Sequence, residues 1–193
     1  MNSKEKIITH LRESAAVKQR IIDHCLSDIE QAVNIIANSL QSGGKLLLCG
    51  NGGSAADAQH IAAEFVVRLS KDLKRPAIAA IALTTDTSLL TAAGNDIGFD
   101  NVFVRQVEAL GRSGDVLLGI TTSGNSENII RAVKKAKKTG MKTIGFLGQV
   151  EGKAGPLFDI SIHIPSQNTQ HIQEGHITVG HILCELVERS LYG

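Results

Sequence analysis

The sequence predicts an α/β fold: a three-layer, doubly wound parallel sheet with long N-terminal helices. Two observations support it. From residue 45 onward, short apolar runs alternate with helical patterns, which is typical of a parallel sheet covered by helices on both faces. Tight turns join these segments, and the chain has 19 Gly against only 3 Pro. The 193 residues are enough for one buried core, so we expect a single domain over residues 1–193.

Residues 3–42 form the first predicted helical region. Apolar residues recur there at steps of three and four, no proline interrupts them, and Gly43-Gly44 supplies a stop. Because the region is long for one helix, we expect two helices with a break near residues 26–30. Their apolar stripe can pack on the chain's own sheet or on another subunit, and periodicity does not choose between these alternatives.

The remaining elements alternate in type along the chain. Strands are expected at residues 45–49, 77–82, 116–120, 142–147 and 160–164. Helices are expected at residues 54–69, 88–94, 101–111, 126–139 and 167–191. Residues 148–156 are the best loop candidate, because this stretch combines glycine, charge and proline.

Composition excludes several classes of function. The net charge of +1 gives no field that would attract nucleic acid or an anionic membrane, and aromatic residues make up only 3%. The N-terminus lacks the continuous apolar core of a signal peptide, and no segment reaches the length of a membrane span. The three cysteines, Cys25, Cys49 and Cys184, are widely spaced, so we expect reduced thiols in a cytoplasmic protein.

The chain is organised around residues 46–68, where an apolar strand ends in a glycine turn and restarts as a helix. The glycines of the turn GNGGS permit close approach of the backbone, and Ser54 can cap the helix or donate its hydroxyl to a ligand. Such a unit points N–H groups and a helix N-terminus at an anion, usually a phosphate. An ordinary tight turn is the plainer alternative.

A second turn of the same kind follows the strand at residues 116–120. It carries four hydroxyl side chains around a glycine, at Thr121, Thr122, Ser123 and Ser126. These groups can form a neutral phosphate-binding nest, although serine and threonine are favoured at helix starts in any case. Two such turns at the carboxyl ends of parallel strands favour a phosphate site over two unrelated turns. The absence of a P-loop lysine argues against a nucleoside triphosphate.

His60 and Glu64 are four residues apart, so their side chains lie on one face of the predicted helix, with Arg68 one turn further. Such a pair can hold a divalent metal or act as acid and base. For an isolated pair, a solvated helix face is the better interpretation. Here the same helix begins at the predicted phosphate site, which favours function.

Further polar residues lie in the last helical pattern and near one sheet-edge loop. The apolar neighbours of His181 predict partial burial of its ring. Gln173 and His181 are eight residues apart, roughly 12 Å along a helix, so they meet one ion only by leaning together or by coming from different subunits. Asn95 and Asp96 can contact a polyol, and ordinary turn roles are as good an explanation.

Four motifs resemble the sugar isomerase (SIS) domain family, whose fold is flavodoxin-like: GNGGSAADAQHIAAEF, TTDTSLLTAAGNDIGFDNVF, GDVLLGITTSGNS and HIQEGHITVGHILCELVE. The resemblance covers nearly the whole chain. It implies a cytoplasmic bacterial homotetramer, with residues 1–42 as a helical oligomerisation segment. It also implies conversion of D-sedoheptulose 7-phosphate to D-glycero-D-manno-heptose 7-phosphate, the first step towards ADP-heptose for lipopolysaccharide core or surface glycans.

The same resemblance implies roles for individual residues. Zinc, one ion per subunit, would be bound by His60, Glu64, Gln173 and His181, and Glu64 and His181 would also act as base and acid. The implied substrate contacts are Asn51, Gly52, Gly53, Ser54, Glu64, Arg68, Asn95, Asp96, Thr121, Thr122, Ser123, Ser126 and Gln173. The chain departs from many family members at Gln170, where an acidic residue is usual.

Two other functions compete with this one. A non-catalytic SIS protein that binds a replication-initiator partner would lack the glutamate and histidine, and both are present here. A SIS isomerase or sensor for another sugar phosphate is less favoured, since the chain has a single SIS-sized unit and no glutaminase or DNA-binding segment. We therefore expect an enzyme that moves a proton between C1 and C2 of a sugar phosphate through an enediol.

Overall fold

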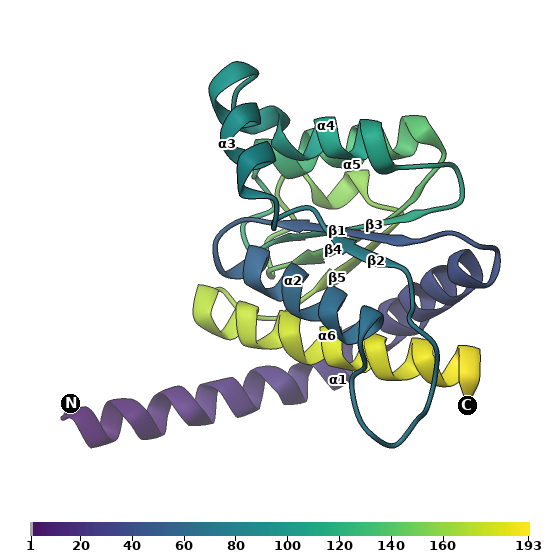
Figure 1. The fold of residues 1–193 in the computed structure, drawn as a ribbon. Helices are drawn as coiled ribbons and strands as arrows, with labels where there is room; N and C mark the ends of the chain where they lie inside the picture. The colour runs from purple at the N-terminus through teal and green to yellow at the C-terminus, as the bar shows by residue number, and fades with distance from the viewer. Residues whose placement is uncertain (1) are drawn as a thin grey trace.

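The computed structural model of the protein describes residues 2–193 and confirms the three-layer α/β fold (Figure 1). Its single sheet has five parallel strands in the order β2-β1-β3-β4-β5. The strands are β1 (Leu46–Gly50), β2 (Ala80–Ala82), β3 (Val116–Thr121), β4 (Lys142–Leu147) and β5 (Ile160–His163). The α-helices are α1 (Ser3–Gln41), α2 (Gly53–Val66), α3 (Thr87–Asp96), α4 (Val102–Leu110), α5 (Glu127–Thr139) and α6 (Thr169–Tyr192). Two short 3-10 helices, η1 (Phe99–Asn101) and η2 (Gly155–Leu157), complete the elements.

Two hydrophobic cores lie on opposite faces of the sheet. Helices α1, α2 and α6 cover one face, and α3, α4 and α5 lie on the other (Figure 1). The central strands β1 and β3 are buried along their whole length, as expected for strands covered on both sides. Alternate residues therefore serve different cores: Leu46 and Leu48 join the α1/α2/α6 side, whereas Leu47 joins the other.

The N-terminal region is one helix, so the predicted break near residues 26–30 is wrong. Helix α1 runs for 39 residues without interruption, roughly 58 Å at 1.5 Å per residue. A capping box between Asn2 and Glu5 starts it. Buried residues recur at helical spacing before, within and after the predicted break, at Cys25, Ile29 and Val33, so the apolar stripe never changes face. No helix breaker interrupts the apolar pattern, and the sheet and α6 pack against the second half of the helix. The whole region therefore forms one long helix.

The N-terminal turns of α1 project beyond the rest of the chain (Figure 1). Val17 is the first residue of the helix that is buried. Several large apolar side chains remain exposed along the helix: Ile7 at 60%, Leu11 at 63%, Ile22 at 53% and Leu26 at 54%. The sequence left open whether the stripe covers the sheet or another subunit. In the single chain one part of it covers the sheet and α6, and the other part is uncovered.

Smaller differences from the predicted boundaries have local causes. Helix α2 ends at Val66 rather than at residue 69, and the chain then crosses to β2 in an irregular segment. Strand β2 is only three residues long because it lies at the sheet edge and pairs with β1 alone. The expected loop at residues 148–156 is irregular until η2 begins at Gly155. Within residues 2–193, no helix combines the length and the apolar character needed to span a membrane.

Candidate active site

Both predicted phosphate loops lie side by side at one edge of the sheet. Strands β1 and β3 are hydrogen-bonded neighbours, with Gly50 paired to Ile120, so the loops that follow them emerge together. Strand β1 stands between β2 and β3 in the sheet order, so the chain reverses its direction of winding here. Ligands of open α/β sheets bind outside the carboxyl ends of the strands at such a switch point.

The first loop approaches α2 too closely for any side chain at Gly50. A Cβ atom there would lie 2.5 Å from the carbonyl oxygen of Ser54. Gly52 adopts φ +56°, and its carbonyl accepts hydrogen bonds from the first turn of α2. The side chain of Asn51 exchanges two hydrogen bonds, of 3.0 and 2.9 Å, with Asn128 of α5. This pair joins the first loop to the helix that follows the second.

The second loop is held from within and from a neighbouring segment. The hydroxyls of Thr121 and Ser126 are 3.1 Å apart, and the backbone carbonyl of Gly124 accepts a hydrogen bond from Ala154. Gly124 has φ +65°, and a Cβ atom there would lie 2.2 Å from the carbonyl oxygen of Glu151. Beside the loop is a cavity of about 440 Å³, lined by Thr122, Ser123, Gln149, Val150, Ser166, Gln167, Thr169 and Ile172.

Gly124→Ala is expected to destabilise the protein, because a left-handed backbone costs a non-glycine residue about 1–2 kcal/mol and the clash with Glu151 adds to this. Chemical denaturation of the two proteins measures the difference. Gly94→Ala is the matched control, since that glycine lies within α3 with open space around it. Alanine should leave stability unchanged or raise it by up to about 1 kcal/mol there. Equal effects of both variants would contradict the conformational role of Gly124.

A compact cluster of His60, Glu64 and His181 lies where α2 and α6 pack together. The Oε1 atom of Glu64 is 2.9 Å from Nε2 of His60 and 3.3 Å from Nε2 of His181. The two Nε2 atoms are 3.2 Å apart. The histidine side chains are 51% and 45% exposed, whereas Glu64 is only 13% exposed. The cluster therefore has an open side formed by imidazoles and an inner side formed by the carboxylate.

His181 is more exposed than its apolar neighbours predict. Val179 and Leu183 are buried, but His181 points to the opposite face of α6. Gly180 lets the two helices approach at this level, because a Cβ atom there would lie 2.7 Å from the side chain of Ile61. Close packing of parallel helices thus brings a residue of α6 against two residues of α2.

The inner side of the cluster has unusual electrostatics. The Oε2 atom of Glu64 is buried and accepts no hydrogen bond from residues 2–193. Burial, and then the charge of Glu64, raise the pKa of the Cys184 thiol, which keeps that sulfur protonated. Asp57, which the sequence reasoning missed, also faces this region. Burial raises the pKa of Asp57, and the nearby His60 and His181 oppose that shift. Asp57 lies three residues before His60, so the sequence alone places both side chains on one face of the helix.

Gln173 is separated from the other three expected zinc ligands within the chain. Its amide lies against Gly53, where a Cβ atom would be 2.5 Å from Nε2 of Gln173. Gly53 is the first residue of α2, roughly 10 Å along the helix before His60. The structure thus brings His60, Glu64 and His181 together and places Gln173 at the loop end of the same helix pair.

The remaining expected contacts are distributed around this edge of the sheet. Ser54 is buried at the start of α2. Arg68 lies beyond the end of α2 and is exposed, so it is not on the same helix as predicted. Asn95 and Asp96 lie at the end of α3, exposed, and Asn95 donates a 2.7 Å hydrogen bond to Asp96.

Comparison with known proteins places this geometry in a family. The SIS domain profile matches residues 9–148, which include both loops and the His60–Glu64 pair. The chain belongs to the SIS domain family. It is 56% identical over 187 residues to the phosphoheptose isomerase of Aquifex aeolicus, covering 97% of each protein. This SIS protein is therefore similar to a named isomerase along nearly its whole length.

Two solved structures agree with the fold. The phosphoheptose isomerase of Neisseria gonorrhoeae has a TM-score of 0.92 at 44% identity, over 97% of this chain and 100% of the other. That of Francisella tularensis has a TM-score of 0.94 at 38% identity, over 98% and 100%. These proteins share both the arrangement of elements and much of the sequence with the SIS protein described here.

Proposed function

We propose that this protein is a phosphoheptose isomerase that converts D-sedoheptulose 7-phosphate to D-glycero-D-manno-heptose 7-phosphate. The observation that carries the proposal is the cluster of His60, Glu64 and His181, two turns of helix from paired phosphate-type loops. The 56% identity to a phosphoheptose isomerase supports the choice of substrate. The product is the first intermediate towards ADP-heptose for lipopolysaccharide core or surface glycans.

The two loops bind the phosphate end of the substrate in this proposal. Backbone N–H groups at a helix N-terminus and neutral hydroxyls suit a phosphate, and both occur at α2 and α5. The proposed phosphate contacts are Gly52, Gly53, Ser54, Thr121, Thr122, Ser123 and Ser126. The proposed contacts to the sugar are Asn51, Arg68, Asn95, Asp96 and Gln173.

The cluster fits zinc. Two imidazoles and a carboxylate are a common donor set for catalytic zinc, with one position left open. Ligands about 2.0–2.1 Å from a tetrahedral ion lie about 3.3 Å apart, and the three donor atoms here are 2.9 to 3.3 Å apart. The buried Oε2 of Glu64, which accepts no hydrogen bond from an N–H or O–H group of residues 2–193, is a further acceptor for a cation. His60, Glu64 and His181 would hold one ion per subunit, and Gln173 would join them after a movement or from another subunit. Bound zinc would supply a Lewis acid that polarises the substrate oxygens.

The protein's own groups move the protons. Glu64 removes a proton from C1 of the ketose and returns it to C2, which carries the substrate through an enediol. His181 gives a proton to the oxygen on C2 and accepts one from the oxygen on C1. The Glu64 and His181 side chains lie side by side in the cluster, so one substrate can reach both. With Nε2 of His181 on an ion, Nδ1 would be the ring nitrogen that exchanges the proton. Atoms and charge balance over the cycle.

A homotetramer with sites near subunit interfaces completes the proposal. The uncovered apolar residues of α1 support residues 1–42 as the oligomerisation segment, since exposed apolar stripes on a helix mark contact surfaces. Light scattering should give four times the 20.5 kDa chain mass, and a monomer would contradict this part. We place the enzyme in the cytoplasm, which the three free, buried cysteines support.

Removing the metal should abolish turnover. After treatment with a chelator and its removal, the protein should convert sedoheptulose 7-phosphate at less than about 1% of the initial rate. Losing the ion itself should cost more than the roughly 10–100-fold lost when a residue that orients a metal ligand is changed. Zinc added in excess over the protein should restore the rate. Full activity of metal-free protein would contradict a catalytic ion.

A further inference from the structure

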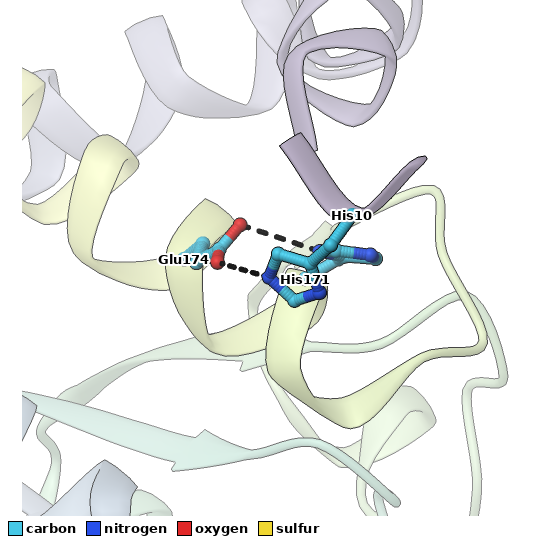
Figure 2. A group of neighbouring side chains, drawn as sticks. All are labelled: His10, His171 and Glu174. Atoms are coloured by element: carbon cyan, nitrogen blue, oxygen red, sulfur yellow. Dashed lines mark hydrogen bonds and ion pairs between the residues drawn. The ribbon is translucent and has the colours of Figure 1, made fainter. Parts of the chain in front are cut away.

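A second cluster of metal-binding side chains joins α1 to the start of α6. It consists of His10 from α1 with His171 and Glu174 from α6, and Figure 2 shows both rings directed at one carboxylate. Glu174 Oε1 is 3.3 Å from Nε2 of His10, and its Oε2 is 3.3 Å from Nδ1 of His171. The ring centroids of the two histidines are 4.4 Å apart. One ligand atom from each residue lies within 4.8 Å of the others.

These distances suit a tetrahedral ion. Two ligands of zinc that are about 2.0–2.1 Å from the metal are separated by about 3.3 Å. Each histidine lies at this distance from one carboxylate oxygen of Glu174, His10 from Oε1 and His171 from Oε2, so an ion between the rings would meet the carboxylate through either oxygen. Two histidines and a carboxylate from two helices supply three of four positions, and solvent can supply the fourth, because His10 and Glu174 are 41% and 38% exposed.

Glu13 lies behind His171, where it would orient the ring without binding the ion itself. Its Oε2 atom is 3.4 Å from Nε2 of His171, the ring nitrogen that faces away from Glu174. Histidines that bind metals usually donate their other N–H to a carboxylate, which fixes the tautomer and the orientation of the ring. The His171 side chain is only 2% exposed, so its ring is held in this arrangement.

The charges also favour a cation. Glu13 and Glu174 lie on either side of His171, and within residues 2–193 no lysine or arginine forms an ion pair with either carboxylate. With neutral imidazoles, the two carboxylates give the cluster a formal negative charge that a divalent ion would offset.

We propose that His10, His171 and Glu174 form a second metal site, oriented by Glu13, that takes a zinc-like divalent ion. The site is distinct from the His60 cluster, because His171 and His181 are ten residues apart, roughly 15 Å along α6. Gln173, between the two α6 ligands in sequence, faces α2 instead. An ion at this site would tie the N-terminal part of α1 to α6, the helix that carries His181.

The test is zinc binding by equilibrium dialysis in a His60→Ala/His181→Ala background, which removes both imidazoles of the first cluster. That protein should bind one zinc ion per chain. Adding His10→Ala should remove it, and adding His24→Ala should not, because His24 is an exposed histidine of the same helix outside both clusters. No bound zinc in the background protein, or a bound ion that survives His10→Ala, would overturn the proposal.

Glu13→Gln provides a second, milder variant in the same background. It keeps the size of the side chain, which is 59% exposed, and removes the charge that orients His171. Zinc affinity should fall about 10–100-fold while one ion still binds at saturation. Unchanged zinc affinity would show that Glu13 does not orient His171 for metal binding. None of these measurements uses turnover, so failure of the isomerase proposal and failure of this one are separate results.

Discussion

Replacing Glu64 with glutamine is expected to lower kcat for the isomerisation by about 10²–10⁴-fold, the usual contribution of a general base. Glutamine has nearly the same shape, so the packing of α2 against α6 should survive. It cannot accept the proton from the sugar, and it contacts His60 and His181 as an amide in place of the shared carboxylate oxygen. Deuterium incorporation at C2 of the aldose product in heavy water, where Glu64 returns the proton, follows this transfer.

Glu185→Gln is the matched control for Glu64→Gln. Glu185 lies four residues after His181, is 52% exposed and, within residues 2–193, forms an ion pair with Arg189 alone. Its exchange rate should equal that of the unaltered protein. If Glu64→Gln exchanged deuterium as fast as this control, Glu64 would not be the base, and the proposed division of roles would fail.

Glu188→Ala is expected to lower the free energy of unfolding by about 3–5 kcal/mol, since removing one partner leaves a buried charge unpaired. Arg75 and Glu188 form a 2.8 Å ion pair with side chains only 1% and 6% exposed. Arg75 also donates to the backbone carbonyls of Glu64 and Phe65, at 2.7 and 2.9 Å. It therefore holds the last turn of α2, the turn that carries Glu64, and the variant should also lower activity.

Urea denaturation measures this loss, and Glu185→Ala is its control. Glu185 lies three residues before Glu188 on the same helix, but its ion pair with Arg189 is exposed. Removing that pair should therefore cost less than about 1 kcal/mol. Similar losses in the two variants would show that the burial of the Arg75–Glu188 pair does not matter.

Local patterns were sufficient to predict most of the fold. The order of strands and helices after residue 45 follows from apolar runs and glycine turns, and each is a property of a few neighbouring residues. The predicted break in α1 failed because length alone suggested it, whereas the buried stripe through Cys25 and Ile29 continues. The predicted start of β2 at residue 77 was wrong because this edge strand pairs with β1 alone and begins only at Ala80, later than its apolar run.

Only the part of the candidate site that is formed by residues close together in the sequence could be predicted. His60 and Glu64 are one helical turn apart, so their proximity follows from the sequence. The approach of His181 depends on the parallel packing of α2 and α6 and on Gly180, which no local pattern reveals. For the same reason no local pattern predicts that His10 meets His171, 161 positions later.

Turnover of defined sugar phosphates by the pure zinc-bound protein tests the central claim most directly. Proton NMR should show D-sedoheptulose 7-phosphate converted to an aldose 7-phosphate, with fructose 6-phosphate and glucosamine 6-phosphate unchanged under the same conditions. No conversion of the heptulose, or faster conversion of either six-carbon substrate, would contradict the assignment of this protein as a phosphoheptose isomerase.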